Sequence, residues 1–441
     1  MPTFSANATS DRSAAISGGV AAVAIGCLLI FPRASPAVLV VLAALGVMAI
    51  RRSPGIENLR MPPLPVVLIL ALGLWATLSA AWASDRNEAI AKGASLLGLT
   101  AAVWWTQAGL PSSNTGLLRH IGVMLLVAFG ACLAFLALEE LTGHAFKRFV
   151  FQTLPFTRPS ARHVAGTGDG LNIAGYITNR NMAVAMLALW PMLLMVRSLV
   201  EPRRRVMVAT ALVLLAVATF AVSAHETSSI ALAASALVFA IAVRWPKIAL
   251  GLVAAGWLVA TLLVVPMATW AAKSAKLDSA TWLPNSARHR IVLWEYTAQH
   301  YWQHPIAGIG AASTRVLDNR RGVNVEVKPG THYQWRSGTH AHNIFLQTWY
   351  ELGAVGALLL CAIGLALVSA IAKLPRDVVP YAAAAMTAGA AMGGTSWGMW
   401  QAWFMAGFAI SAVLLGFAMQ LEASGDPSDR REISPDQAPS S

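Results

Sequence analysis

The chain has 441 residues, of which 56% are hydrophobic and only 12% are charged. With a mean hydropathy of +0.59, it is too apolar for an ordinary soluble globular protein, and the composition predicts a polytopic membrane protein. The formal net charge of +12 does not indicate a nucleic-acid partner, because Lys and Arg lie in loops between apolar runs and form no basic helix. Anionic lipid or phosphate is the expected partner instead.

In chain order, a series of apolar runs approaches or exceeds the roughly 17 residues that a helix needs to cross the hydrocarbon core of a bilayer. They cover residues 14–32, 35–50, 63–82, 89–105, 119–138, 182–200, 206–223, 228–244, 248–269, 343–371, 378–397 and 402–421. The sequence therefore predicts an all-α polytopic membrane protein of about 12 transmembrane helices. A helical bundle in lipid can hold a long chain as one body, so we expect residues 1–441 to form a single transmembrane helical domain.

The short connections between these runs predict the orientation, because Lys and Arg gather on the cytoplasmic side. One side is basic, with Arg51, Arg52, Arg60, Arg203, Arg204, Arg205, Arg244, Lys247, Lys373 and Arg376. The opposite short connections are poor in Lys and Arg. Because the helix count is even, both termini are expected in the cytoplasm. Residues 422–441, rich in Ser, Asp and Pro, are expected to form a disordered tail.

Two long connections, residues 141–181 and 270–341, fall on the outer side, and the larger one joins the ninth and tenth helices. Each carries more Lys and Arg than Asp and Glu. Long loops are translocated largely regardless of charge, so this excess does not contradict the orientation. A phosphate-bearing ligand at the outer leaflet would account for it.

Within the larger loop, Ser286–Ala307 has aromatic and polar residues at the spacing of a short amphipathic helix lying in the membrane interface. The helix is predicted to end at His304-Pro305, because proline disfavours helical geometry in the residue before it. The following Gly308-Ile309-Gly310 is predicted to be a flexible turn.

Four residues at the mouth of the tenth apolar run, His340-Ala341-His342-Asn343, form the strongest candidate site. Ionisable residues at a membrane boundary that face a large loop indicate function by default. The structural alternative for His342 is a helix cap or a hydrogen-bonded interface residue, and His340 could equally steady the loop. Glu351, further along the same run, is expected to face the interior of the bundle.

The residues that follow this site carry a recognisable pattern. His342-Asn343, followed after nine residues by Gly353-x-x-Gly356, resembles a signature of the O-antigen ligase and polymerase superfamily of membrane glycosyltransferases. Upstream, three further segments are similar to other elements of that superfamily; they are Tyr176–Asn181, Arg290-x-x-x-Trp294 and Pro305-x-x-Gly308-x-Gly310. The resemblance covers about residues 170 to 420.

The resemblance implies an O-antigen ligase, which transfers O-antigen glycan from undecaprenyl diphosphate to the lipid A-core oligosaccharide at the periplasmic face of the bacterial inner membrane. Both long outer loops would then be periplasmic. Two other functions of the superfamily remain open, an O-antigen polymerase and a protein O-oligosaccharyltransferase. A secondary transporter is the alternative from another class, but the helix interiors lack the paired charges that transporters place at mid-membrane.

Transfer to a sugar hydroxyl needs a base, because an alcohol is a poor nucleophile, and His342 is the expected catalytic residue. Imidazole has an ordinary pKa of about 6.5, and both partial burial and nearby cations would keep it neutral and able to accept a proton. His340 is expected to contact substrate. Asn343 and Gln347, the latter about one turn further on, are expected to orient sugar hydroxyls.

Arginine suits the diphosphate leaving group, because a guanidinium forms bidentate hydrogen bonds and stays charged. The candidates are Arg180, Arg288 and Arg290, and the alternative for each is contact with lipid headgroups. The superfamily commonly places an arginine after a serine at the start of a helix where this chain has Ser223-Ala224-His225. Arg180 or Arg162 is expected to supply that cation.

We expect no metal ion and no other cofactor. His332, His340 and His342 do not have the spacing of a recognised zinc site, and arginines can stabilise the developing charge instead. The three cysteines lie within apolar runs and indicate neither a disulfide framework nor a metal site. A direct displacement with inversion is expected, because no carboxylate pair resembles that of a retaining enzyme.

Overall fold

The computed structural model describes residues 4–51, 61–109, 115–157, 163–166, 170–320, 322 and 325–424. Several sequence predictions lie outside these residues: Arg162 as a phosphate ligand, the basic residues Arg52 and Arg60, and the tail from residue 425 onward. Of the segment predicted to be a tail, the structure describes residues 422–424, and α16 (Ala402–Ala423) extends through the first two of these.

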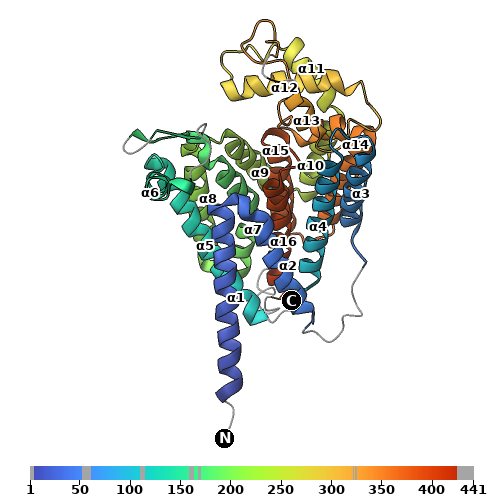
Figure 1. The fold of residues 1–441 in the computed structure, drawn as a ribbon. Helices are drawn as coiled ribbons and strands as arrows, with labels where there is room; N and C mark the ends of the chain where they lie inside the picture. Colours follow the sequence, from blue (N-terminus) through green and yellow to red (C-terminus); the bar gives the residue numbers. More distant parts are fainter. Residues whose placement is uncertain are drawn as a thin grey trace, which may run out of the picture.

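The molecule is predominantly helical, as predicted (Figure 1). Each predicted apolar run overlaps a long helix, because in lipid a backbone must satisfy its own polar groups within the segment. These helices are α1 (Phe4–Ile30), α2 (Ser35–Arg51), α3 (Leu64–Leu78), α4 (Arg86–Gly109), α5 (Thr115–Leu141), α7 (Asn179–Leu199), α8 (Pro202–Val222), α9 (Glu226–Arg244), α10 (Pro246–Leu262), α14 (Ile344–Ile371), α15 (Val379–Thr395) and α16. The described strands are β1 (Val164–Ala165) and β2 (Asn172–Ile173), which pair antiparallel.

Among the described residues, seven helices are individually long and apolar enough to cross a membrane. An eighth span is formed if α10 and α11 (Val264–Lys273), which are bent by 70° at the break between them, count as one. Other helices miss these criteria for local reasons: α15 has 17 residues, and α4 begins with the charged residues Arg86, Glu88 and Lys92. Length and composition therefore support seven or eight membrane spans among the described residues, and the count of twelve spans stays a prediction.

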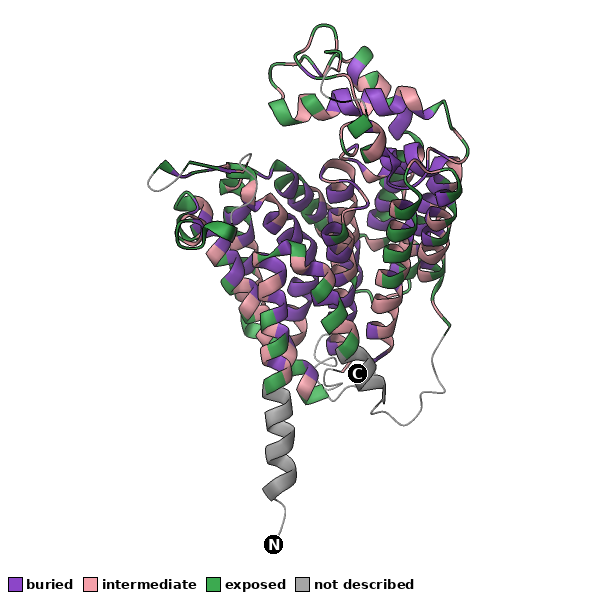
Figure 2. Ribbon diagram, viewed as in Figure 1, coloured by how far each residue is buried: buried purple, intermediate pink, exposed green. Residues whose placement is uncertain are grey.

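Helix α7 is the centre of the bundle. Every residue from Asn181 to Val196 is buried, as expected for a helix that is apolar all round and packs against neighbours on every side (Figure 2). In Figure 1, α1, α5 and α8 lie on one side of it, whereas α3, α4, α10 and α14 lie on the other side of the molecule. Helix α16 runs between the two groups and packs along α7, for example through the Ser411 hydroxyl, which donates to the Leu187 carbonyl oxygen at 2.6 Å.

Helix α14 is broken near the middle. Gly353 has φ +65° and ψ −164°, far from helical values, and the break frees backbone groups on both sides of it. The segment that precedes α13 bonds to these groups. The Gly310 N–H donates to the Glu351 carbonyl oxygen at 2.8 Å, and the Ala354 N–H donates to the Pro305 carbonyl oxygen at 2.9 Å. The two glycine-containing motifs of the sequence therefore meet at one place in the fold.

The predicted flexible turn at Gly308-Ile309-Gly310 is instead tightly packed. Gly308 and Gly310 have φ values of +69° and +93°. A methyl group on Gly308 would lie 2.3 Å from the carbonyl oxygen of Glu351, and one on Gly310 would lie 2.5 Å from Cα of Ala83. Glycine is needed at both positions because the backbone near Glu351 and that near Ala83 approach this turn more closely than a side chain allows. The prediction of flexibility was therefore wrong.

Three further helices, α11, α12 (Asn285–Tyr301) and α13 (Ser313–Arg320), lie at one end of the bundle, the upper end in Figure 1. Helix α12 corresponds to the predicted amphipathic helix, but it ends at Tyr301 rather than at His304-Pro305. The chain leaves the helix earlier because residues from Pro305 onward bond to the break in α14. The location of α12 in a membrane interface stays a prediction.

Ion pairs hold the segments around α12 and α13 together. The Lys328 ammonium lies 2.5 Å from Asp278 Oδ2 and also bonds to Glu295. Arg336 donates from Nη2 to Asp318 Oδ2 at 2.6 Å, and the same guanidinium bonds through Nε. All three acids are buried. These pairs therefore fix residues 325–336 against both helices.

The described part of residues 141–181 holds α6 (Ala145–Thr153), the β1–β2 pair and the short helix η7 (Gly175–Thr178), and these elements lie at the same upper end (Figure 1). At the opposite end, Arg197 in the last turn of α7 bonds to Glu422 at the end of α16, with 3.2 Å between Nε and Oε1, and also to Asp377 before α15. Helix α7 thus runs from the upper end to a polar junction at the lower end.

Candidate functional site

A cavity of about 690 Å³ lies at the upper end of the bundle. Its wall is built by the turn after α1, the starts of α4 and α7, helix α13, the first turns of α14 and the connection between α15 and α16. Its charged lining residues are Arg33, Lys92, Arg180, Arg315, Asp85, Glu88 and Glu351. Because Lys92 and Glu88 pair with each other at 3.0 Å, the remaining charged groups are Arg33, Arg180 and Arg315 against Asp85 and Glu351, so the arginines leave the wall with a small positive excess.

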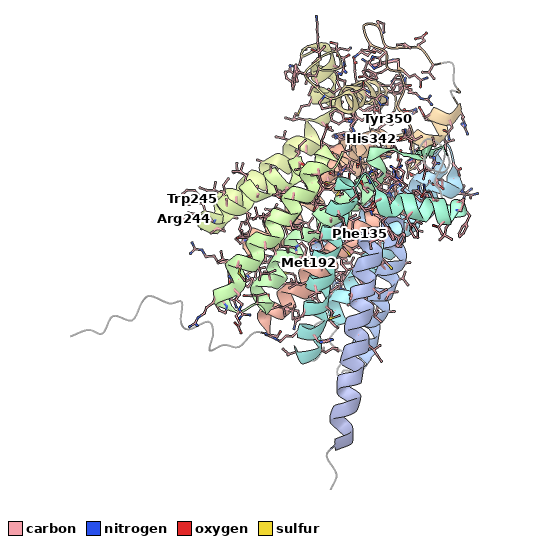
Figure 3. The ribbon with its side chains drawn as sticks, turned by 90° about the vertical axis from the view of Figure 1, so that its left-hand side faces the viewer. Phe135, Met192, Arg244, Trp245, His342 and Tyr350 are labelled. Atoms are coloured by element: carbon pink, nitrogen blue, oxygen red, sulfur yellow. The ribbon has the colours of Figure 1, made fainter. Side chains whose placement is uncertain are left out.

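His342 lies just before α14, at the end of the bundle that carries α11 and α12 (Figure 3). It is half-buried, its φ is +53°, and its Nδ1 lies 2.5 Å from the Ser396 carbonyl oxygen. A carbonyl oxygen can only accept, so Nδ1 carries the proton and donates. In the neutral ring, Nε2 is then the atom with a free lone pair.

Burial lowers the pKa of His342 to about 3, and the neighbouring His340, Arg290 and His289 act in the same direction. The imidazole is therefore neutral at physiological pH, in the protonation state that a base requires. His342 is not among the described residues that line the cavity. Its ring lies 4.1 Å, centroid to centroid, from the ring of His340.

His340 does line the cavity. Its Nδ1 lies 3.0 Å from the Thr339 hydroxyl and its Nε2 lies 3.5 Å from Nε2 of Gln401. Burial, together with the charges of Arg290 and Arg315, lowers the pKa of His340 to about 4. The two histidines are thus neighbours, and of the two His340 is the one among the described residues that lines the cavity.

Asn343 and Gln347 both hold protein segments in place. Asn343 is the N-cap of α14, because its Oδ1 accepts from the Phe345 N–H at 3.0 Å and the Leu346 N–H at 3.1 Å. It is not among the described residues that line the cavity, whereas Gln347 is. Gln347 accepts from the Met399 N–H at 3.0 Å and donates from Nε2 to Glu351 at 3.1 Å.

Arg180 and Arg33 form the cationic end of the cavity. Arg180 begins α7, its guanidinium carbon lies 5.7 Å from the centroid of the Trp403 ring, and its Nε is buried with no partner among the described residues. Arg33 is close enough to repel it. The side-chain amide of Asn181 donates to the carbonyl oxygens of Leu29 and Ile30 at 2.7 and 3.0 Å. These bonds connect the start of α7 to the end of α1 and so keep the two arginines close to each other.

Arg290 lies near both histidines but not on the cavity wall, as far as the described residues define it. Burial lowers its own pKa, and the Glu226 carboxylate partly offsets that effect. Four residues along the same face of α12, the Trp294 indole N–H donates to the Ala341 carbonyl oxygen at 2.7 Å. Arg288 is half-buried and its Nε is without a partner among the described residues.

His225 lies directly before α9, at the end of the Ser223-Ala224-His225 segment. Its side chain is 3% exposed, its Nδ1 lies 2.7 Å from the Ser228 hydroxyl, and its ring stacks on Trp397 at 5.1 Å. Burial, together with the charge of Arg290, lowers the pKa of His225 to about 3. The imidazole is therefore neutral, and the cation that acts on it, Arg290, belongs to α12.

The connection between α15 and α16, residues 396–403, was missed as a site element in the sequence, where it is only a short outer turn. Its residues contact most of the candidate residues. Ser396 accepts from His342, Met399 donates to Gln347, Trp400 donates to Glu351, Gln401 reaches His340, and Trp403 lies beside Arg180. Its density of Trp, Gly and Gln is the signal that could have indicated a role beyond a turn.

One comparison with known proteins identifies the family. Residues 211–361 match the family model described as O-antigen ligase. This match supports membership of the O-antigen ligase superfamily. The chain is therefore a multi-pass membrane protein of a glycosyltransferase-like enzyme superfamily, as its apolar helices also indicate. A comparison with curated proteins found no match.

The matched region of this superfamily member includes both histidines, Arg290 and the start of α14, but not Arg33, Arg180 or residues 396–403. The cavity is therefore assembled from the matched region and from segments on both sides of it in the sequence. Among the described residues, no group of three His, Cys, Asp or Glu side chains is placed to hold a metal ion.

Proposed function

We propose that the protein is an O-antigen ligase that transfers O-antigen glycan from undecaprenyl diphosphate to the lipid A-core oligosaccharide. The family match supports this choice. The observation that carries it is the meeting of the His340–His342 pair with three arginines, Arg33, Arg180 and Arg315, at one end of the helical bundle. A base and a cluster of cations are what transfer from a lipid diphosphate to an alcohol requires.

The cavity then faces the periplasm, and both termini face the cytoplasm of a bacterium. The distribution of charge supports this orientation. Helix α7 begins at the cavity, and Arg197 in its last turn bonds to Asp377. The basic residues Arg203–Arg205, in the first turn of α8, and the basic connection Lys373–Arg376 therefore lie at the opposite end of the bundle. Basic short loops are typical of the cytoplasmic side.

The diphosphate of the donor binds at the cationic end, where Arg180 and Arg33 offer guanidinium groups, and Arg290 and Arg288 contribute from the α12 side. The unpartnered Nε of Arg180 supports this assignment. An anion placed between two like charges relieves their repulsion, which favours binding of the diphosphate between the two guanidinium groups. The polyprenyl chain extends from there into the surrounding lipid.

The chemical step is a direct displacement. The acceptor hydroxyl oxygen attacks the anomeric carbon of the transferred sugar, its proton passes to Nε2 of His342, and the bond from that carbon to the diphosphate oxygen breaks with its electron pair. The diphosphate keeps that pair and its new charge is stabilised by the arginines. Attack opposite the leaving group inverts the anomeric carbon, and the step needs no metal ion.

Donor binding strengthens the base. With a pKa of about 3, His342 is neutral but weakly basic. The negative charge of a bound diphosphate raises the pKa of a nearby imidazole, because it stabilises the imidazolium form. The base thus becomes most effective when the donor is in place.

The test is transfer by the purified protein in liposomes, with a lipid-diphosphate glycan as donor and a chelator present. Lipid A-core, a second lipid-linked glycan and a Ser/Thr peptide are offered separately as acceptors. Transfer to lipid A-core alone supports the proposal, whereas transfer to the second glycan or to the peptide identifies a polymerase or a protein oligosaccharyltransferase. His342→Ala should abolish transfer at normal membrane expression, and His340→Ala should reduce it.

A further inference from the structure

We propose that Glu351 is a positioning residue, which holds two separate walls of the cavity on α14 and so sets the geometry of the histidine pair. The inference rests on the proposed function, but it concerns a residue for which neither the family match nor the superfamily signature assigns a role. Glu351 is fully buried and also lines the cavity. Buried carboxylates are retained only where donors compensate for the loss of water.

Five donors converge on this carboxylate. Oε2 accepts from the Ala312 N–H at 2.8 Å and from the Trp400 indole N–H. Oε1 accepts from the Thr314 N–H at 3.3 Å, the Thr314 hydroxyl at 2.5 Å and Nε2 of Gln347 at 3.1 Å. Because each of these groups can donate, an ionised carboxylate satisfies all of them at once.

The first wall is α13. Ala312, just before this helix, has φ +59°, a conformation that alanine keeps only where its surroundings demand it. Glu351 holds this conformation through two hydrogen bonds. Its carboxylate accepts from the Ala312 N–H, and its carbonyl oxygen accepts from the Gly310 N–H at 2.8 Å. The helix that follows presents Arg315 to the cavity, and Arg315 lies close enough to His340 to lower its pKa.

The second wall is the connection of residues 396–403. Glu351 binds it directly through Trp400 and indirectly through Gln347, which accepts from the Met399 N–H at 3.0 Å. This connection carries the Ser396 carbonyl oxygen that orients His342 and the Gln401 amide beside His340. Loss of the carboxylate therefore releases both walls that orient the histidines, while the helices themselves keep their contacts.

The experiment compares Glu351→Gln with Glu139→Gln. Glu139 is a matched control, because it is also buried (2% exposed) and accepts backbone N–H groups, from Phe146 at 2.7 Å and Lys147 at 3.2 Å, but it is not among the described residues that line the cavity. In Glu351→Gln, an NH₂ group replaces one carboxylate oxygen and faces hydrogen-bond donors. Those donors then have no acceptor, so the hydrogen bonds to that side of residue 351 are lost. We expect kcat to fall about 100-fold with donor KM changed less than about threefold, since misplacement of reacting groups acts mainly on kcat. Glu139→Gln should keep kcat.

A second measurement separates this inference from the proposed function. Hydrogen exchange of residues 311–320 and 396–403 should be faster in Glu351→Gln than in the wild type and in Glu139→Gln, whether or not glycan transfer is detected. If the wild type transfers nothing but exchange changes as expected, the proposed function fails and the positioning role stands. Wild-type kcat together with wild-type exchange in Glu351→Gln overturns the inference.

Should Glu351→Gln fail to fold, Trp400→Phe and Thr314→Val provide the test, because each removes one donor and leaves the carboxylate. Each is expected to lower kcat about tenfold at an unchanged thermal midpoint. A lowered midpoint with unchanged kcat of the folded fraction would assign Glu351 a purely structural role and overturn the proposal.

Discussion

The Nδ1–H of His342 donates to the carbonyl oxygen of Ser396 across 2.5 Å. This single bond joins the start of α14 to the end of α15, and it determines the tautomer of the neutral ring. In many catalytic histidines, a carboxylate or a carbonyl oxygen accepts a hydrogen bond from one ring nitrogen and so leaves the other nitrogen free to exchange a proton. The backbone carbonyl of Ser396 plays that part here.

The first prediction concerns pH. Because the pKa of His342 is lowered to about 3, the neutral base is present at every pH above that value, and protonation removes it only below. We expect kcat/KM, which reports the free enzyme, to show no loss attributable to this residue between pH 8 and pH 5. The acid limb of kcat should lie at higher pH, because a bound diphosphate raises the pKa. A fall in kcat/KM on acidification that is centred near pH 6.5 would show that burial does not lower the pKa of His342.

The break in α14 leads to the second prediction. A methyl group on Gly353 would lie 2.2 Å from the Ile306 carbonyl oxygen, in a residue with φ +65°. Gly353→Ala should therefore destabilise the protein by about 3 kcal/mol or more, measured as the thermal midpoint in detergent. Gly251→Ala is the control, since a methyl group there meets nothing within 4 Å, and it should be neutral or slightly stabilising. Equal midpoints for the two variants would exclude the close approach.

The third prediction tests the contact between Gly398 and His340. A methyl group on Gly398 would lie 2.6 Å from Cβ of His340, so His340 or the connection that carries Gly398 must move. We expect Gly398→Ala to fold normally and to lose about 10- to 100-fold in kcat. Gly394→Ala is the matched control, because its methyl group would lie 3.6 Å from Phe345, an ordinary contact. Similar turnover by both variants would argue that His340 has no catalytic importance.

The fourth prediction concerns the cationic end of the cavity. Arg33→Lys and Arg180→Lys keep the charge but lose the planar fork that binds a diphosphate through two hydrogen bonds. Donor KM should rise about tenfold in each, with a smaller change in kcat. Arg203→Lys, in the first turn of α8, should leave donor KM unchanged. The assignment of the diphosphate to this end is wrong if all three variants have the wild-type donor KM.

Several parts of the fold could be predicted from the sequence because each depends on one segment alone. The position of the long helices follows from the apolar runs, and the burial of Glu351 from its place in one of them. The position of His342 at the mouth of α14 was visible in the same way, whereas the role of Asn343 as the N-cap of that helix was not predicted. The helical part of Ser286–Ala307 was also recognisable, although its end was not.

Other features depend on segments that are far apart in the chain, and only the tertiary structure decided them. The pairing of Arg33 with Arg180, the five donors on Glu351 and the contacts of residues 396–403 each join different helices. The flexible turn predicted at Gly308–Gly310 failed for the same reason, because the backbones of Glu351 and Ala83 occupy the space around it. Hydropathy is a property of a single segment, whereas the partner of a buried polar group is set by which segments meet.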